Sequence, residues 1–230
     1  NYTHFYVKKA DASRVYGLEL EHILSPYSMN FLVYKDTLIE EHIAGIPGDD
    51  FINDFLPKCT ESEKAQIAKE FVKFKERCLV RLLGDMRSYN YVITPTHDFD
   101  QIIYKIRAID FDQQSFEGNL KVYNLQFMKE NFKMVEMVSK KLQNNSIRQY
   151  KLEERSYMAK RMITVPRRTT RLIKCMKKDT ISYPENVELL KSHLIQYVGD
   201  VKFKDCNNMG EILETILAFV KRNYLDITSK

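Results

Sequence analysis

The alternation of apolar and polar residues predicts strands in the first half of the chain and helices in the second. The predicted strands are residues 3–9, a pair within residues 30–43, and a hairpin formed by residues 91–95 and 101–109. A Lys35-Asp36 turn would join the middle pair, and residues 96–100 would close the hairpin. These segments are rich in β-branched and aromatic residues, which favour strands.

Helical spacing of apolar residues marks the rest of the chain. The predicted helices are residues 11–24, 60–82, 122–142, 148–163, 168–178, 185–198 and 209–225. Asp11 or Ser13 can cap the first of them. Residues 44–51 contain two glycines and a proline, and we expect a loop there. Strands concentrated in one half and helices in the other predict an α+β fold.

Composition narrows the class of protein. The chain has 230 residues, of which 44% are hydrophobic and 29% charged, so a packed soluble protein is expected rather than disorder. It has no run of eighteen apolar residues, and no membrane span is expected. Its four cysteines form no CxxC pair, which favours reduced thiols and a cytoplasmic location over a zinc site or disulfides.

Two short segments place polar residues beside apolar runs. The first, residues 82–93, contains Asp85 and, after four intervening residues, Asn90. The second, residues 105–114, contains Asp110 after an apolar run. Carboxylate and amide oxygens are the ligands that Mg²⁺ prefers, and phosphoryl transfer depends mainly on positioning and charge neutralisation. The two segments therefore hold oxygen ligands of this kind beside apolar runs.

The order of these residues resembles the protein-kinase-like superfamily, and is nearest to its aminoglycoside and choline phosphotransferase branch. The resemblance implies a two-lobed fold with a mostly helical C-terminal lobe. Residues 1–44 would form part of the N-terminal lobe, residues 45–142 the catalytic core, and residues 143–230 a helical extension.

The resemblance also implies roles for individual residues in the transfer of the ATP γ-phosphoryl group to a hydroxyl. Asp85 would accept or orient the proton of the hydroxyl, and Arg87 would neutralise the transferring group. Asn90 and Asp110 would ligate Mg²⁺, with Asp112 as a further metal neighbour. The acceptor, a protein or a small molecule, stays open.

Residues upstream fit the nucleotide-binding half of the same pattern. Lys8 ends a strand and would bind phosphate, with Glu19 of the following helix as its ionic partner. Glu19 lies amid the apolar face of that helix, whereas Glu21 is expected on its polar side. The backbone carbonyl of Glu41 and the backbone amide of Ile43 would bond adenine.

The chain departs from the family pattern in three places. Leu83 replaces the usual His before the catalytic Asp, and Asp112 replaces the Gly that follows Asp-Phe in protein kinases. A glycine-rich phosphate loop is not present in the seven residues before Lys8. Either the loop lies upstream of Asn1 or it is absent. If it is absent, ATP would be held less firmly, and a pseudokinase that binds nucleotide without turnover is the first alternative.

A basic segment gives the second alternative. Residues 148–178 hold eleven Lys or Arg residues against two Glu. Such a segment is usually a helix with one packed and one solvated side. It can also be a docking surface for an anionic partner, in which case the chain would be a nucleic-acid or acidic-protein binding module.

Overall fold

A computed structural model describes residues 4–99 and 101–228 of the chain. It contains two separate antiparallel sheets of three strands each, together with a larger set of helices. This confirms the α+β class expected from the sequence. Residue 3 of the first predicted strand and residue 100 of the predicted hairpin turn lie outside the described residues.

The first sheet is formed by the N-terminal part of the chain. Its strands are β1 (Phe5–Lys9), β2 (Phe31–Tyr34) and β3 (Thr37–Glu41), in the order β1-β3-β2. Helix α1 (Ala12–Leu24) connects β1 to β2. It begins where predicted, because the Asp11 side chain accepts the backbone N–H of Arg14 at 2.9 Å and caps the first turn.

The second sheet combines β4 (Ile46–Pro47), β5 (Tyr91–Asp98) and β6 (Gln101–Ala108), in that order. Strands β5 and β6 form the predicted hairpin, but pairing extends as far as Asp98 and Gln101, so the turn is shorter than expected. Helix α3 (Glu61–Arg81) packs along this hairpin. A reciprocal capping box between Thr60 and Glu63 fixes its start.

The prediction of a loop over residues 44–51 is wrong for its second half, which is helical. After β4 the chain forms a short helix α2 (Gly48–Asp50) and then a π-helical turn (Phe51–Phe55). Phe51 and Ile52 are almost completely buried there. Burial of these apolar side chains outweighs the turn preference of the glycines and proline around them.

The C-terminal half is helical. Its helices are α4 (Phe132–Lys141), α5 (Asn144–Thr164), α6 (Pro166–Met176), α7 (Pro184–Val198) and α8 (Met209–Thr228). Each predicted helix is present there except the one over residues 122–142. Three 3₁₀ turns replace its first half, and in two of them an Asn side chain, Asn119 or Asn124, bonds a backbone N–H two residues on. Asn side chains that bond the backbone in this way compete with a continuous helix.

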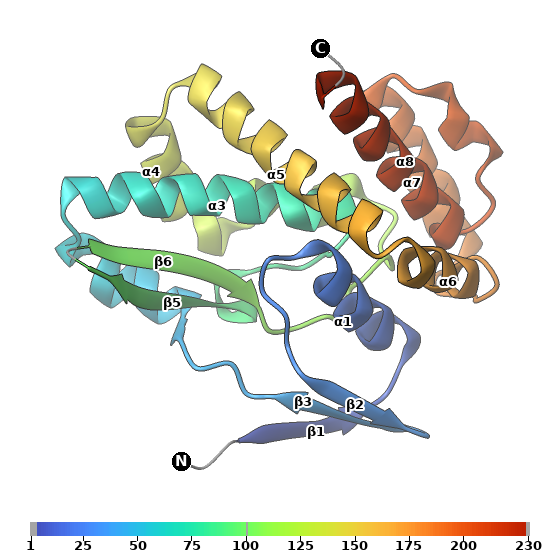
Figure 1. Cartoon of the computed structure of the whole chain (residues 1–230), viewed down its shortest axis with the longest axis horizontal. Helices are drawn as coiled ribbons and strands as arrows, with labels where there is room; N and C mark the ends of the chain where they lie inside the picture. The colour runs from blue at the N-terminus through green and yellow to red at the C-terminus, as the bar shows by residue number, and fades with distance from the viewer. Residues whose placement is uncertain (1–3, 100, 229–230) are drawn as a thin grey trace.

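Helices α1 and α3 join the two halves of the molecule. In Figure 1, α3 lies along the β5–β6 hairpin, while α1 lies between the β1–β3 sheet and helices α5 and α6. Leu18 of α1 belongs to a core shared with α3 and the β5–β6 hairpin. Leu20 and Ile23 of α1 belong to a second core built with α5, α6, α7 and α8. No helix in the described ranges has both the length and the apolar character needed to cross a bilayer.

Gly17 of α1 permits close packing on the segment after β6. A Cβ at this position would lie 2.7 Å from the Cβ of Phe111. Ala favours helices over Gly by about 1 kcal/mol, but overpacking of a core costs about 1–3 kcal/mol. We therefore expect Gly17→Ala to lower the free energy of unfolding, measured by urea denaturation.

Gly199→Ala is the control for this prediction. Gly199 has φ +75° and no atom within 4 Å of an added Cβ, so its substitution tests backbone strain without a clash. A gain in stability for Gly17→Ala would show that α1 can move away from Phe111.

Candidate functional site

The two polar segments singled out in the sequence lie side by side. The Ser115 amide donates to the Leu82 carbonyl at 2.8 Å, and the Ile109 amide donates to the Asn90 carbonyl at 3.1 Å. Leu82 has φ 57° and ends α3, so the chain reverses there into the Asp85–Asn90 loop. The end of α3 thus brings the first segment against the residues that follow β6.

Asp85 has a left-handed backbone, with φ 53°. Asp tolerates this conformation better than most residues do, but it is still strained. Its carbonyl accepts the Arg87 amide at 2.8 Å and the Asn90 side-chain Nδ2 at 2.7 Å. These two bonds stabilise the turn and fix Asp85 relative to Asn90.

Arg87 lies beside Asp85 and is shared between two acids. Its Nε donates to the Asp85 carboxylate at 2.7 Å, and its Nη1 lies 3.4 Å from Glu130. The hydrogen bond and charge of Asp85 raise the pKa of the Arg87 guanidinium. The ion pair joins the Asp85 carboxylate to the Arg87 guanidinium, and both side chains are partly exposed.

Asn90, Asp110 and Asp112 offer oxygen ligands of the kind that Mg²⁺ takes. Because the Asn90 Nδ2 donates to Asp85, the Asn90 Oδ1 remains as an acceptor. The Asp112 amide lies 3.4 Å from the Asp110 carboxylate, and the Asp112 carboxylate lies 3.6 Å from Arg14 of α1. Burial raises the pKa of the Asp112 carboxyl, and the charge of Asp110 raises it further.

Two carboxylates and an amide oxygen are the kinds of ligand that Mg²⁺ takes. Within the described residues, no group of three His, Cys, Asp or Glu side chains is arranged to hold a metal ion. Mg²⁺ commonly binds through one or two carboxylates and keeps water or phosphate oxygens as its other ligands. Asp110 and Asn90 line the same cleft, and Asp112 follows Asp110 by two residues but is not among the lining residues.

A cleft of about 320 Å³ opens between the first sheet and the β4–β5 region. It is lined by Tyr6, Lys8, Met29, Glu40, Glu41, His42, Ile43, Gly45, Pro47, Tyr89, Asn90, Val92, Ile109 and Asp110. This volume is at the lower end of the range for small-molecule sites. Lys8, Glu41, Ile43, Asn90 and Asp110, all predicted as site residues, therefore meet in one place although they are far apart in sequence.

The predicted pairing of Lys8 with Glu19 is wrong. Lys8 Nζ lies 2.8 Å from the carboxylate of Glu40. Tyr6 is the partner of Glu40 in the β1–β3 pairing, so Lys8, two residues along, lies on the same face and reaches Glu40 diagonally. A neighbour on the adjacent strand therefore pairs with Lys8 in place of a residue on the helix.

Glu19 is directed away from the cleft. Its carboxylate accepts the Nε and Nη2 of Arg168 on α6, at 3.0 and 2.8 Å. The role of Glu19 in nucleotide binding, implied by the resemblance, thus loses its expected contact. The ion pair instead joins α1 to the first turn of α6.

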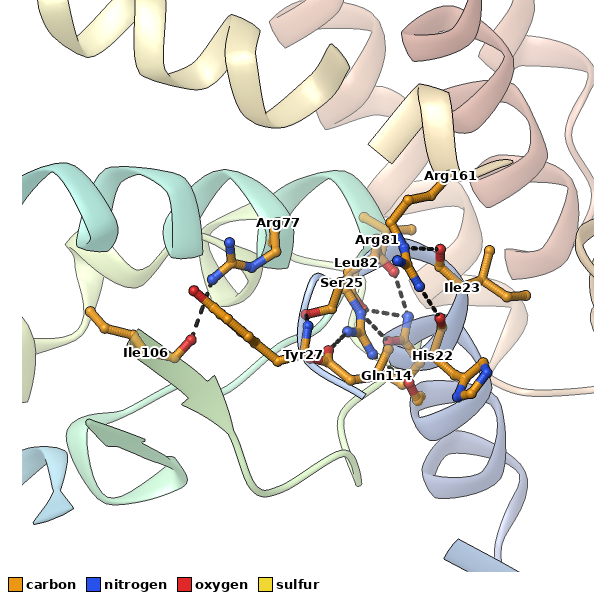
Figure 2. Close-up of polar contacts among 12 residues, drawn as sticks. His22, Ile23, Ser25, Tyr27, Arg77, Arg81, Leu82, Ile106, Gln114 and Arg161 are labelled. Atoms are coloured by element: carbon orange, nitrogen blue, oxygen red, sulfur yellow. Dashed lines mark hydrogen bonds and ion pairs between the residues drawn. The ribbon is translucent and has the colours of Figure 1, made fainter. Parts of the chain in front are cut away.

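Glu21, expected on the polar side of α1, is buried and paired with Arg81 of α3. The guanidinium of Arg81 also donates to the carbonyl of Gly17 and to Gln114, and it lies 5.5 Å from the centre of the Phe111 ring. Figure 2 shows Arg81 with Gln114, which bonds the Leu82 carbonyl in turn. One buried cation therefore links α1, the end of α3 and the segment after Asp110.

Two further arginines stabilise the surroundings of this network. Arg161 of α5 donates to the last carbonyls of α1, those of His22 and Ile23, at 2.7 and 2.8 Å (Figure 2). Cations at a helix C-terminus interact favourably with its dipole. Arg77 of α3 is paired with Glu154 and Glu70, each at 3.0 Å. These contacts hold α1 and α5 against α3.

Sequence reasoning missed Glu40, Arg81 and Gln114. A signal for Glu40 was available, because it is two residues from Leu38 in a strand and must share its buried face. Arg81 and Gln114 carried no such signal, because their partners lie more than thirty residues away.

No family model matches the sequence, and no curated protein or solved structure is significantly similar to it. The function of the cleft must therefore be inferred from its own residues and their geometry.

The buried pair of Arg81 and Glu21 gives a prediction about stability. Arg81→Met leaves the Glu21 carboxylate buried without its cation, and breaking such a pair costs about 3–5 kcal/mol. Replacing both residues, in Glu21→Leu/Arg81→Met, should cost much less than the sum of the single changes, because no buried charge remains.

Urea denaturation of the wild type, both single variants and the double variant measures this coupling. If the losses in the free energy of unfolding were additive, the two side chains would have no interaction energy with each other. Lys140→Met, which removes one cation from an exposed i,i+4 pair with Glu136, should change stability by less than about 0.5 kcal/mol.

Proposed function

We propose that the chain is an ATP- and Mg²⁺-dependent phosphotransferase with a protein-kinase-like fold, acting on a hydroxyl acceptor in the cytoplasm. The observation that supports this most directly is that Lys8, Asn90 and Asp110 line one cleft while Asp85 is fixed to Asn90. A cation, two oxygen ligands and a positioned carboxylate are the groups that phosphoryl transfer requires.

In the proposed fold, the first sheet and α1 form the N-terminal lobe, within residues 1–44. Residues 45–142 supply the catalytic core, and residues 143–230 the helical extension. The nucleotide would bind between the sheet and the core, with its base near Glu41 and Ile43. Both residues line the cleft, and Ile43 is itself buried.

Each residue of the candidate site then has a stated task, although Asp85, Arg87 and Asp112 are not among those that line the cleft. Lys8 would bind phosphate oxygens, and Glu40 would hold Lys8 in place through their ion pair at 2.8 Å. Asn90 and Asp110 would hold the metal, with Asp112 beside them. Bound Mg²⁺ would neutralise charge on the β- and γ-phosphates. Asp85 would orient the acceptor hydroxyl, and Arg87, already beside it, would face the developing charge.

Nucleotide binding is tested by thermal unfolding of the full chain with and without Mg²⁺-ATP. A ligand that binds only the folded state raises its stability by RT ln(1 + [L]/Kd), which is about 2.7 kcal/mol at one hundred times the Kd. We expect a rise in Tm that depends on Mg²⁺. Asp110→Ala should reduce this rise, because the metal loses its carboxylate.

Turnover is tested separately, by phosphate release and autophosphorylation. Asp85→Asn should keep Mg²⁺-ATP binding but reduce transfer by about 10²-fold or more, because it removes the group that receives or orients the proton. Normal transfer by Asp85→Asn would exclude the role assigned to Asp85. Binding without transfer in the wild type would favour the pseudokinase.

The positive charge of α6 favours a second function, the binding of a partner protein. Its basic residues Arg167, Arg168, Arg171 and Lys174 are followed by Lys177 and Lys178, and α6 itself contains no acid. Arg168 and Lys177 are paired, with Glu19 and Glu214. Within the described ranges no ion pair involves Arg167, Arg171, Lys174 or Lys178. These four residues leave a surface of uncompensated positive charge.

A groove of about 530 Å³ lies beside this surface, between α6 and α8. Met162, Ile173 and Leu217 form its apolar floor, and Lys174, Lys177, Lys178 and Lys221 stand around it with a single acid, Glu214. An apolar groove with a basic rim suits an acidic amphipathic helix of a partner protein better than a nucleic-acid backbone, which has no apolar face to bury. We propose that such a helix docks here.

Fluorescence anisotropy with a labelled amphipathic Glu/Leu peptide tests this docking site. Lys174→Glu/Lys178→Glu should weaken binding by about tenfold or more, whereas Lys140→Glu on α4 should not, and added salt should weaken the wild type. An oligonucleotide that binds more tightly than the peptide, with the same dependence on Lys174 and Lys178, would assign the surface to nucleic acid.

A further inference from the structure

A second cavity, of about 470 Å³, shares none of its lining residues with the cleft. It lies between α7 and two 3₁₀ turns, Leu120–Tyr123 and Leu125–Phe127, and Leu79 of α3 also contributes to it. Four amide side chains, a histidine, a lysine, two aromatic residues and two leucines line it, and none of these described residues is an acid. Its volume lies within the range of small-molecule sites.

Three of the four amide side chains have their oxygen atoms committed to the protein. Asn119 Oδ1 accepts the Lys121 backbone amide at 3.0 Å, and Asn124 Oδ1 accepts the Gln126 backbone amide at 3.5 Å. Gln126 Oε1 accepts the Lys75 ammonium at 2.9 Å. A backbone amide or an ammonium can only donate, so the oxygen end of each side chain must face it. The three NH₂ groups donate to no other described residue and remain available to a ligand.

His193 and Lys121 add further donors. His193 Nδ1 accepts the Leu120 amide at 3.4 Å, so the proton of the neutral ring lies on Nε2, which can donate it. The Lys121 ammonium lies 5.5 Å from the centre of the Phe127 ring, on the same lining. Backbone acceptors are already used, because the carbonyls of Asn119 and Lys121 accept amides within the turns. The cavity therefore presents an excess of N–H donors together with positive charge.

Apolar surface accompanies these donors. The side chains of Phe127 and Tyr197 are 52% and 54% exposed, and Leu79 and Leu120 line the same cavity. Aromatic rings that are open to solvent can pack against a flat or apolar ligand. A ligand that satisfies the whole lining thus has an acceptor-rich end and an apolar end.

We propose that this cavity binds a small organic anion, whose carboxylate or phosphate oxygens accept the free N–H groups while its apolar body lies against Phe127 and Tyr197. A carboxylate or a phosphate offers several acceptor oxygens, and hydrogen bonds to an ionised acceptor are about twice as strong as those to a neutral one. The Lys121 charge favours the same ligand. The inference does not depend on nucleotide binding in the cleft.

Binding is tested by NMR titration of the full chain, followed at the backbone amides of residues 119–127. The probes are phenyl phosphate, benzoate and, as their neutral counterpart, benzyl alcohol. We expect at least one of the two anions to bind about tenfold or more tightly than benzyl alcohol. The tighter of the two identifies which anion the cavity takes. Equal binding of all three probes, or no shift of these amides with either anion, would overturn the proposal.

Asn124→Asp tests the donors directly. The variant keeps an oxygen for the Gln126 amide but replaces the NH₂ donor by a charged oxygen, so anion binding should weaken by about tenfold or more. Asn145→Asp, at an exposed position of α5, introduces the same charge outside the lining and should leave the Kd almost unchanged. Equal losses in the two variants would mean that net charge, and not the cavity, governs binding.

Gln126→Glu repeats this exchange at a second position. Its carboxylate can still accept the Lys75 ammonium, and only the NH₂ donor is lost. The variant keeps the proposal testable if Asn124→Asp does not fold. Wild-type affinity for the anion in folded Asn124→Asp or folded Gln126→Glu would contradict the proposal.

Discussion

A single buried guanidinium, that of Arg81, holds together the parts of the molecule on which the cleft depends. It lies at the end of α3 and contacts Glu21 and the Gly17 carbonyl of α1 on one side. On the other side it reaches Gln114. Arginine suits this position because its planar group carries five donors in fixed directions, so one side chain can satisfy several acceptors in a dry interior. The network specifies one arrangement of these segments, and a buried charge makes the alternatives costly.

The contacts of Arg81 determine where the two polar segments of the candidate site lie. Gln114 bonds the Leu82 carbonyl at the start of the Asp85 loop, and Phe111 follows Asp110 directly. Arg81 therefore fixes where the two polar segments lie without taking part in the cleft. The residues with proposed chemical roles are connected to one another by separate bonds, such as that between Asn90 and the Asp85 carbonyl at 2.7 Å.

Local patterns predicted most of the elements, because strands and amphipathic helices bury one face at a fixed period. The strand pair β2–β3, the capped start of α1 and the long helix α3 all followed from such patterns. The helix expected over residues 122–142 did not form as one piece, because Asn side chains bond the local backbone. Residues 44–51 were expected to be a loop because they contain two glycines and a proline. The burial of Phe51 and of the next residue, Ile52, could not be read from that composition.

The candidate site was predictable in part for a similar reason. Spacing within one loop, from Asp85 to Asn90, is visible in a sequence, as is the acid that follows an apolar strand. Ion-pair partners are not, since they depend on which elements meet. Lys8 was assigned to Glu19 from the family resemblance and from the position of Glu19 in its helix. The strand register instead pairs Lys8 with Glu40, and Glu19 pairs with Arg168. Glu21 was placed on the polar face because its partner, Arg81, is sixty residues away.

The pairing of Glu19 with Arg168 connects α6 to the helix that packs beside Asp110. Helix α1 is held at its C-terminal end by Arg161 and near its middle by Arg168, while Gly17 lies directly against Phe111, the residue after Asp110. Helix α6 is therefore joined to α1 by an ion pair, and α1 lies directly against the residue that follows Asp110. Helix α1 is thus the element that lies between the basic groove and the segment that carries Asp110.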